Sequence, residues 1–126
     1  MNLSASAAIA AVVVAGATMF ALPEAGAAVE DLNVRVGLSN GYGTGCAYTV
    51  TALVDGEQPV VFSDSAAADF TPQPAITPTA GSATVNWTPT IPGLHVITAT
   101  QGASVHRTQV SVGTGISTGS TTCRVI

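Results

Sequence analysis

The chain has 126 residues, which leaves room for a short export leader and one ordinary domain but not for two such domains. Charged residues make up only 8% of it, lysine is absent, and the formal net charge is −4. Because Arg35, Arg107 and Arg124 are the only strong cations, there is no basic footprint for a phosphate backbone, and nucleic-acid binding is excluded.

The N-terminal segment, residues 1–27, predicts a signal peptide. Residues 5–22 carry no charge and are almost wholly apolar from residue 7 onward. Ala25, Gly26 and Ala27 form the small-x-small pattern of a cleavage site. We expect cleavage after Ala27, or alternatively after Ala28, and one domain over residues 28–126. Residues 1–6 lack Lys and Arg, which departs from the usual pattern. The competing interpretation is an uncleaved anchor, since about 18 uncharged residues nearly span a bilayer.

Apolar residues after the leader recur with a period of two, which is typical of β-strands. Residues 32–38 alternate in this way, and a glycine-rich loop follows over residues 39–45. Residues 46–54 form the next strand, and Asp55-Gly56 is a turn signal before a short strand at residues 60–63. The strand over residues 46–54 places five side chains on one face: Cys46, Tyr48, Val50, Ala52 and Val54.

The second half of the domain continues the same pattern. Three prolines in residues 64–80 disfavour a helix there, so we expect only a short edge strand near residues 69–71. Residues 83–88 form a strand with Val85 and Trp87 inward, and residues 94–100 and 105–112 form a hairpin. About seven short strands predict an all-β antiparallel sandwich. Its expected core contains Val34, Val36, Tyr48, Val50, Phe62, Val85, Trp87, Ile97, Val110 and Val112.

Cys46 and Cys123 are the only cysteines, and both lie in the exported part. An even number of cysteines in an oxidising compartment predicts one disulfide, the alternative being two free thiols. Without a CxxC motif or a Cys/His cluster, the chain has no ligand set for zinc.

One group of residues resembles a known family. Trp87-Thr88-Pro89, followed by Gly93, His95, Ile97 and Ala99, resembles a signature of bacterial immunoglobulin-like domains. Together with Gly45-Cys46-x-Tyr48-x-Val50 and the ending Val112-Gly113-Thr114-Gly115-Ile116…Cys123, the sequence is similar to small secreted immunoglobulin-like proteins of actinobacteria. The resemblance implies an immunoglobulin-like β-sandwich, and it carries over no binding residue.

The resemblance also contains two departures from antibody-type domains. Ala99 occupies the position of the second cysteine of those domains, so the disulfide would join the strand at residues 46–54 to the C-terminal tail. His95 occupies the position where a corner tyrosine usually lies.

Few residues offer chemistry. His95 and His106 could hold a transition metal weakly if they faced each other, although we expect His95 to bond backbone and His106 to be an ordinary strand residue. Asp64 and Asp69 could contribute to a calcium site but supply too few oxygens alone. The glycine-rich loop at residues 41–45 lacks the lysine and following helix of a phosphate loop, and we expect Tyr42 at its exposed tip.

We therefore expect no catalytic residue, metal or cofactor. The residues that matter are the disulfide pair Cys46 and Cys123 and the core residues Trp87, Tyr48, His95 and Ile97.

The function predicted from these observations is a non-enzymatic secreted or cell-envelope module. It would act in structural or protein/glycan interaction, without a membrane span after processing. The exposed threonine-rich sheet faces would supply the contacts, through Thr49, Thr51, Thr84, Asn86, Thr88, Thr98 and Thr100.

Two alternatives remain. The first is a carrier of a small hydrophobic ligand, similar to the immunoglobulin-like apoproteins that sequester enediyne chromophores. Those proteins carry two disulfides, whereas this chain has cysteines for one. The second is an envelope pore subunit, which needs longer strands with an apolar outer face.

Overall fold

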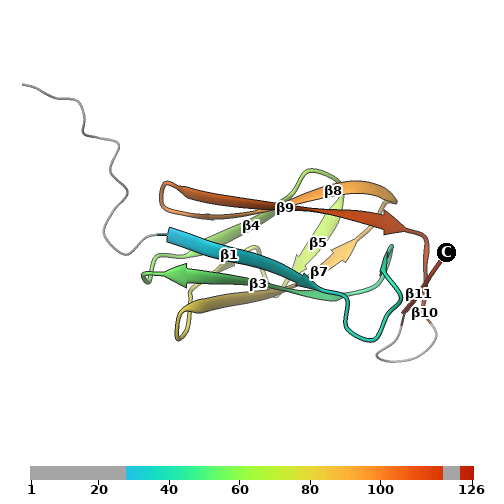
Figure 1. Cartoon of the computed structure of the whole chain (residues 1–126), viewed down its shortest axis with the longest axis horizontal. Coiled ribbons are helices and arrows are strands. Elements are labelled where there is room, and N and C mark those ends of the chain that lie inside the picture. Colours follow the sequence, from blue (N-terminus) through green and yellow to red (C-terminus); the bar gives the residue numbers. More distant parts are fainter. Residues whose placement is uncertain (1–27, 118–122) are drawn as a thin grey trace, which may run out of the picture.

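The computed structural model describes residues 28–117 and 123–126, so the predicted leader at residues 1–27 lies outside the described residues. These residues form strands and no helix, and none of them provides a helix long and apolar enough to cross a membrane. Figure 1 shows the strands stacked in two layers along one long axis. Seven strands have four or more residues: β1 (Ala28–Arg35), β3 (Tyr48–Asp55), β4 (Val60–Asp64), β5 (Ala68–Thr71), β7 (Ser82–Pro89), β8 (Gly93–Gln101) and β9 (Ser104–Gly113).

The remaining strands are short. They are β2 (Tyr42–Gly43), β6 (Ala75–Ile76), β10 (Gly115–Ser117) and β11 (Cys123–Val125). One sheet has the order β1-β3-β7-β5 and the other the order β2-β9-β8-β4-β6, while β10 and β11 form a separate pair. Neighbouring strands are antiparallel except β2 and β9. This order is that of an immunoglobulin-like sandwich, so the predicted all-β fold is confirmed.

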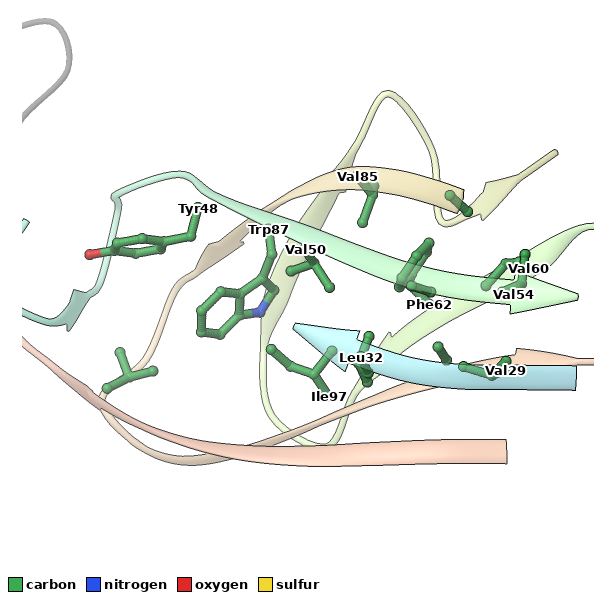
Figure 2. Close-up of a cluster of buried hydrophobic side chains, with 14 of the residues drawn as sticks. Val29, Leu32, Tyr48, Val50, Val54, Val60, Phe62, Val85, Trp87 and Ile97 are labelled. Atoms are coloured by element: carbon green, nitrogen blue, oxygen red, sulfur yellow. The ribbon is translucent and has the colours of Figure 1, made fainter. Parts of the chain in front are cut away.

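The core lies between the two sheets and follows the predicted alternation. On β3, Tyr48, Val50, Ala52 and Val54 are buried while the residues between them are not, because side chains alternate across a strand. Figure 2 shows Trp87 close to Val50 and Ile97, with Phe62 farther along the same interior. Trp87 is completely buried, and it is the largest side chain in the core.

Two expectations about the first strand and its loop are wrong. Val36 is 36% exposed and lies outside the core, because β1 ends at Arg35. A β-bulge between Val29 and Asp31 shifts the register of β1 on β3. The bulge turns both Val29 and Leu32 inward, so the buried stretch begins earlier than a regular alternation predicts.

Tyr42 is the second correction, since it is half-buried and not at an exposed loop tip. Its hydroxyl donates to the Val34 carbonyl oxygen at 2.6 Å. Its ring meets the rings of Tyr48 and Trp87 edge-on, with centroid distances of 5.1 Å and 6.0 Å. Burial raises the pKa of the Tyr42 phenol, and the nearby Tyr48 phenol adds to the effect. The loop closes one end of the core because β2 pairs with β9.

The C-terminal segment is tied to the same end of the sandwich. Cys123 forms a disulfide with Cys46, and their Cα atoms are 6.2 Å apart. The side-chain amide of Asn40 both accepts from the Val125 N–H at 2.8 Å and donates to the Val125 carbonyl oxygen at 3.2 Å. The Val125 side chain packs against Gly43 and Gly113. A Cβ atom added at Gly43 would lie only 2.9 Å from this side chain, and one added at Gly113 only 2.7 Å from it. Glycine at these two positions is what allows the segment to approach so closely.

The disulfide should contribute a large part of the stability. It closes a loop with a sequence separation of 77 residues, for which the chain-entropy model gives about 4.5 kcal/mol. We expect the double variant Cys46→Ala, Cys123→Ala to lose about 4 kcal/mol of unfolding free energy in urea denaturation. The wild-type protein measured in reductant serves as the control and should lose a similar amount. A loss below about 1 kcal/mol in both would show that the segment is held by its non-covalent contacts.

Candidate functional site

The most concentrated polar cluster in the described part of the chain is buried between the sheets. It joins Asp64 at the end of β4, His95 on β8 and Trp87 on β7. The side chains of His95 and Asp64 are 0% and 2% exposed. Asp64 Oδ2 accepts from Trp87 Nε1–H at 2.8 Å and lies 2.6 Å from His95 Nδ1. Because β4 and β7 belong to different sheets, this one carboxylate links the two layers.

The alternation of the strands brings these side chains inward. On β4, Val60 and Phe62 point to the core, and Asp64 is the next residue with that direction. On β8, His95 shares the inner face with Ile97, Ala99 and Gln101. The inward turn of a carboxylate is therefore a consequence of the strand pattern.

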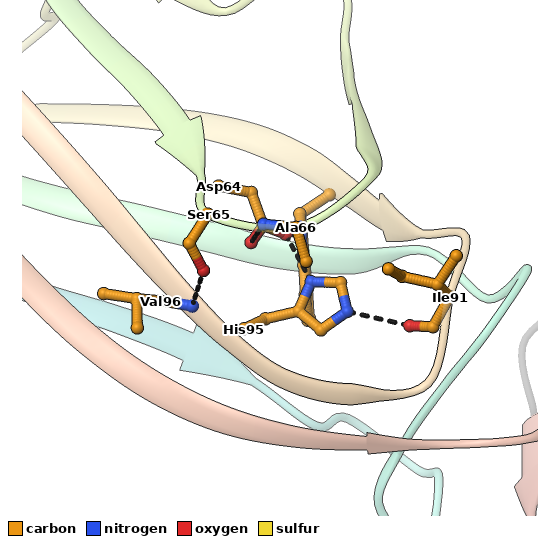
Figure 3. A network of polar contacts seen from close by, with 7 residues as sticks. Asp64, Ser65, Ala66, Ile91, His95 and Val96 are labelled. Carbon is orange, nitrogen blue, oxygen red and sulfur yellow. Dashed lines mark hydrogen bonds and ion pairs between the residues drawn. The ribbon is translucent and has the colours of Figure 1, made fainter.

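The chain after β4 fixes the orientation of the carboxylate. Asp64 Oδ1 accepts from the Ala66 N–H at 3.0 Å, a local side-chain to backbone bond of the kind that forms turns. Ser65 holds this turn against β8: its N–H donates to the Val96 carbonyl oxygen at 3.0 Å, and its Oγ accepts from the Val96 N–H at 2.9 Å. Figure 3 shows Asp64, Ser65 and Ala66 gathered beside His95 and Val96.

The hydrogen bonds leave the imidazole of His95 no free nitrogen. Nε2 lies 2.8 Å from the Ile91 carbonyl oxygen, which can only accept, so Nε2 carries a hydrogen and donates. Nδ1 is hydrogen-bonded to Asp64 Oδ2. The ring of Trp87 stands edge-on to the imidazole at a centroid distance of 5.6 Å. To act as a general base or metal ligand, His95 would have to break one of these bonds in a site closed to solvent.

The cluster therefore acts as a structural link. His95 bonds the backbone four residues upstream, as a corner tyrosine does in immunoglobulin domains.

The other sequence-predicted pairs do not come together. His95 is opposite Val110 in the β8–β9 ladder, whereas His106 is opposite Ala99, so the two histidines do not face each other. Asp69 is exposed on β5, while Asp64 is buried within the sandwich. Among residues 28–117 and 123–126, no group of three or more His, Cys, Asp or Glu side chains could hold a metal ion.

Sequence reasoning missed the roles of two buried polar residues. For Asp64 the sequence suggests only a calcium ligand, although its spacing from Val60 and Phe62 indicates an inward position. Gln101 is also completely buried, and its Nε2 donates to the Gln58 carbonyl oxygen at 3.0 Å, which holds the turn after β3. Gln101 lies two residues after the buried Ala99, so the alternation along the strand indicates an inward position for Gln101 as well.

The outer face of the β1-β3-β7-β5 sheet is the second candidate site. We call it the hydroxyl face, because hydroxyl and amide side chains dominate it. Thr51 and Thr84 are paired across β3 and β7, with their Oγ1 atoms 3.3 Å apart. Thr98 and Thr100, for which the sequence also predicts exposure, are half-buried and lie on β8 in the other sheet. The central residues of the hydroxyl face are Asn33, Thr49, Thr51, Thr71, Ser82, Thr84, Asn86 and Thr88.

An open cavity of about 690 Å³ lies at the end of the sandwich where β1 begins and β3 ends. The turn after β3 forms one wall, and the loop before β7 forms the other. Asp55 and Glu57 supply carboxylates at this site, and both are exposed. The lining also includes Val54, Thr77, Pro78, Thr79 and Ala80.

Removing the buried carboxylate should destabilise the fold strongly. Asp64→Ala leaves the Trp87 Nε1–H and the His95 imidazole without their buried acceptor, so we expect a loss of about 3 to 5 kcal/mol of unfolding free energy. Asp64→Asn keeps one acceptor oxygen and should lose less. The control is Asp69→Ala, an exposed substitution expected to change stability by no more than about 0.5 kcal/mol. Equal losses for Asp64→Ala and Asp69→Ala in urea denaturation would contradict the assigned role.

Solved structures that are similar to this chain include a part of intimin and two parts of an S-layer protein. The D00–D0 domain of intimin matches with a TM-score of 0.56 and 20% identity, over 80% of this chain and 53% of that one. Domains 4 and 5 of the S-layer protein SbsC match with a TM-score of 0.39 and 16% identity, over 79% of this chain and 55% of that one. A longer part of the same S-layer protein matches with a TM-score of 0.45 and 17% identity, over 85% and 14%.

The chain thus spans about half the length of the first two of these structures and a small part of the third. No family model matches the chain, and no curated protein matches it. At this identity the similarity to intimin shows the fold, which is an immunoglobulin-like β-sandwich.

Proposed function

We propose that the protein is a non-enzymatic module of the cell envelope or extracellular space that acts by binding another macromolecule. The disulfide supports an oxidising compartment, since such bonds are rare in proteins kept in reducing ones. The predicted leader at residues 1–27 agrees with export. The occupied ring nitrogens of His95 argue against acid–base catalysis, because neither can exchange a proton with a bound substrate.

The observation that carries this proposal is the hydroxyl face. Threonine dominates it, and a β-branched side chain is already restricted at χ1, so it loses little conformational entropy when a partner binds. The eight central side chains offer hydrogen-bond donors and acceptors and carry no charge, although Arg35, Asp69 and the exposed Leu53 lie on the same face beside them. A surface of this kind suits a partner that is polar and nearly uncharged.

A protein partner has more support than a glycan. Sugar rings commonly pack their C–H groups against exposed aromatic faces. In residues 28–117 and 123–126, Tyr48, Phe62 and Trp87 are buried, while Tyr42 and Phe70 are half-buried. The hydroxyl face therefore provides hydrogen bonds without an aromatic platform.

The alternative, a carrier of a small hydrophobic ligand, has less support. Trp87, Phe62 and Ile97 fill the space between the sheets and have almost no exposed surface. The cavity at the end of the sandwich includes the carboxylates of Asp55 and Glu57, which an apolar ligand would have to desolvate.

A matched pair of threonine variants tests the proposal. Thr84→Arg places a long cation in the hydroxyl face, and Thr100→Arg makes the same change on the outer side of the other sheet. We expect Thr84→Arg to weaken co-sedimentation of the purified protein with isolated cell envelopes about tenfold, a loss of about 1.4 kcal/mol. Thr100→Arg should bind like the wild type, and both variants should keep the wild-type unfolding temperature.

Protease treatment of the envelopes before the assay distinguishes the two classes of partner. Loss of binding after treatment supports a protein, and retained binding supports a glycan. No binding by the wild type, or equal weakening by both arginine variants, would contradict the proposed function.

A further inference from the structure

Exposed charges are unevenly distributed along the long axis of the sandwich. Four exposed carboxylates gather at one end, which we call the acidic pole: Glu30 and Asp31 near the start of β1, and Asp55 and Glu57 at the end of β3 and in the turn after it. The register sets them together, because Ala28 is opposite Asp55 and Asp31 is opposite Leu53. Figure 1 shows β1 starting at this end and the C-terminus marked at the other.

The opposite end, which we call the basic pole, carries two exposed arginines. Arg35 ends β1, and Arg124 lies on β11 opposite Ile116. The loop after β1 joins them, since Ser39 Oγ accepts from the Cys123 N–H at 3.2 Å and Asn40 bonds to Val125. Two other carboxylates lie in this half of the sandwich. Asp64 is buried in its bonds to Trp87 and His95, and the exposed Asp69 of β5 lies opposite Thr88, at the sheet edge away from β1.

Neither set of charges is neutralised within the molecule. Among residues 28–117 and 123–126, the single ion pair is the buried contact between Asp64 and His95. The carboxylates of the acidic pole and the guanidinium groups of the basic pole are therefore both available to a partner.

The two poles also differ in shape and polarity. The acidic pole contains the open cavity of about 690 Å³, whose lining includes Val54, Pro78 and Ala80 besides Asp55 and Glu57. The basic pole presents large apolar side chains, with Leu38 79% and Ile126 72% exposed. Ile116, beside Arg124, is 46% exposed. The basic pole therefore has exposed apolar side chains beside cations, and the acidic pole has a hollow beside anions.

We propose that the protein associates head to tail with itself, with the basic pole of one copy docked on the acidic pole of the next. The second copy is the partner because it carries the complementary charge and the apolar side chains that the cavity can receive. Since the two contacting surfaces differ, each copy retains one free pole, and the contact extends into an open chain of copies. This inference goes beyond the proposed function, because it uses the ends of the sandwich and not the hydroxyl face.

Charge-reversal variants test the contact by sedimentation velocity at low ionic strength. We expect the wild type to show concentration-dependent association that weakens as salt is added, because salt screens exposed charges. Arg124→Glu cancels the net positive charge of the basic pole, where only Arg35 remains as a cation, and Glu57→Arg reduces the negative charge of the acidic pole. Each variant alone should associate at least about tenfold more weakly than the wild type.

Mixing the two variants is the decisive step. The unchanged acidic pole of Arg124→Glu can dock on the unchanged basic pole of Glu57→Arg, and where the two altered poles meet, positions 57 and 124 again carry opposite charges. The mixture should therefore associate more strongly than either variant alone. The matched control is Arg107→Glu, which makes the same change in net charge in the middle of β9 and should associate like the wild type.

A wild type that stays monomeric across the accessible concentrations would overturn the inference. So would a mixture no stronger than its components, or an Arg107→Glu variant as weak as Arg124→Glu. Envelope binding separates this inference from the proposed function. Thr84→Arg should weaken envelope binding and keep self-association, whereas loss of self-association alone leaves the proposed role of the hydroxyl face unaffected.

Discussion

The polar connection between the two sheets depends on the hydrogen bonds of the Asp64 carboxylate. It accepts from Trp87 of one sheet and holds His95 of the other, while its second oxygen closes the turn at Ala66. Antibody-type domains connect their layers with a disulfide packed against a tryptophan. Here the single disulfide ties the C-terminal segment to the loop before β3, so the hydrogen bond from the indole takes over the connection between sheets. A buried carboxylate is costly unless every oxygen is bonded, and in this cluster each oxygen is.

The other buried polar side chains also make contacts that hold the fold. His95 is committed at both nitrogens, and Gln101 uses its Nε2 to hold the turn after β3. The surfaces available to a partner are the hydroxyl face and the two poles, which differ in charge. The low charge of the chain matters here, since a few exposed carboxylates and arginines stand out against a surface of threonine, serine and glycine.

Much of the fold could be predicted because burial with a period of two is a local property. It placed β3, β4, β7 and the β8–β9 hairpin, and the short edge strand β5, close to their positions in the structure. It failed at Val36 because β1 ends at Arg35, and the residue at which strand pairing stops is not set by the local alternation. It failed at Tyr42 because that ring is held by Val34, Tyr48 and Trp87, which the sheet pairing brings together. Asp64 followed the local alternation, but its partners lie on β7 and β8, so its bonds could not be foreseen from spacing alone.

The central claim is that the Trp87 indole is bonded to Asp64 inside the closed sandwich. Trp87 is the only tryptophan, so its indole N–H gives one signal in a nitrogen-resolved proton spectrum. Hydrogen exchange of this signal with solvent tests the claim directly. We predict exchange as slow as that of the most protected backbone amides of β3 and β7, because release of the N–H requires the two sheets to separate. Exchange at the rate of an exposed indole, in a protein whose strand amides remain protected, would contradict it.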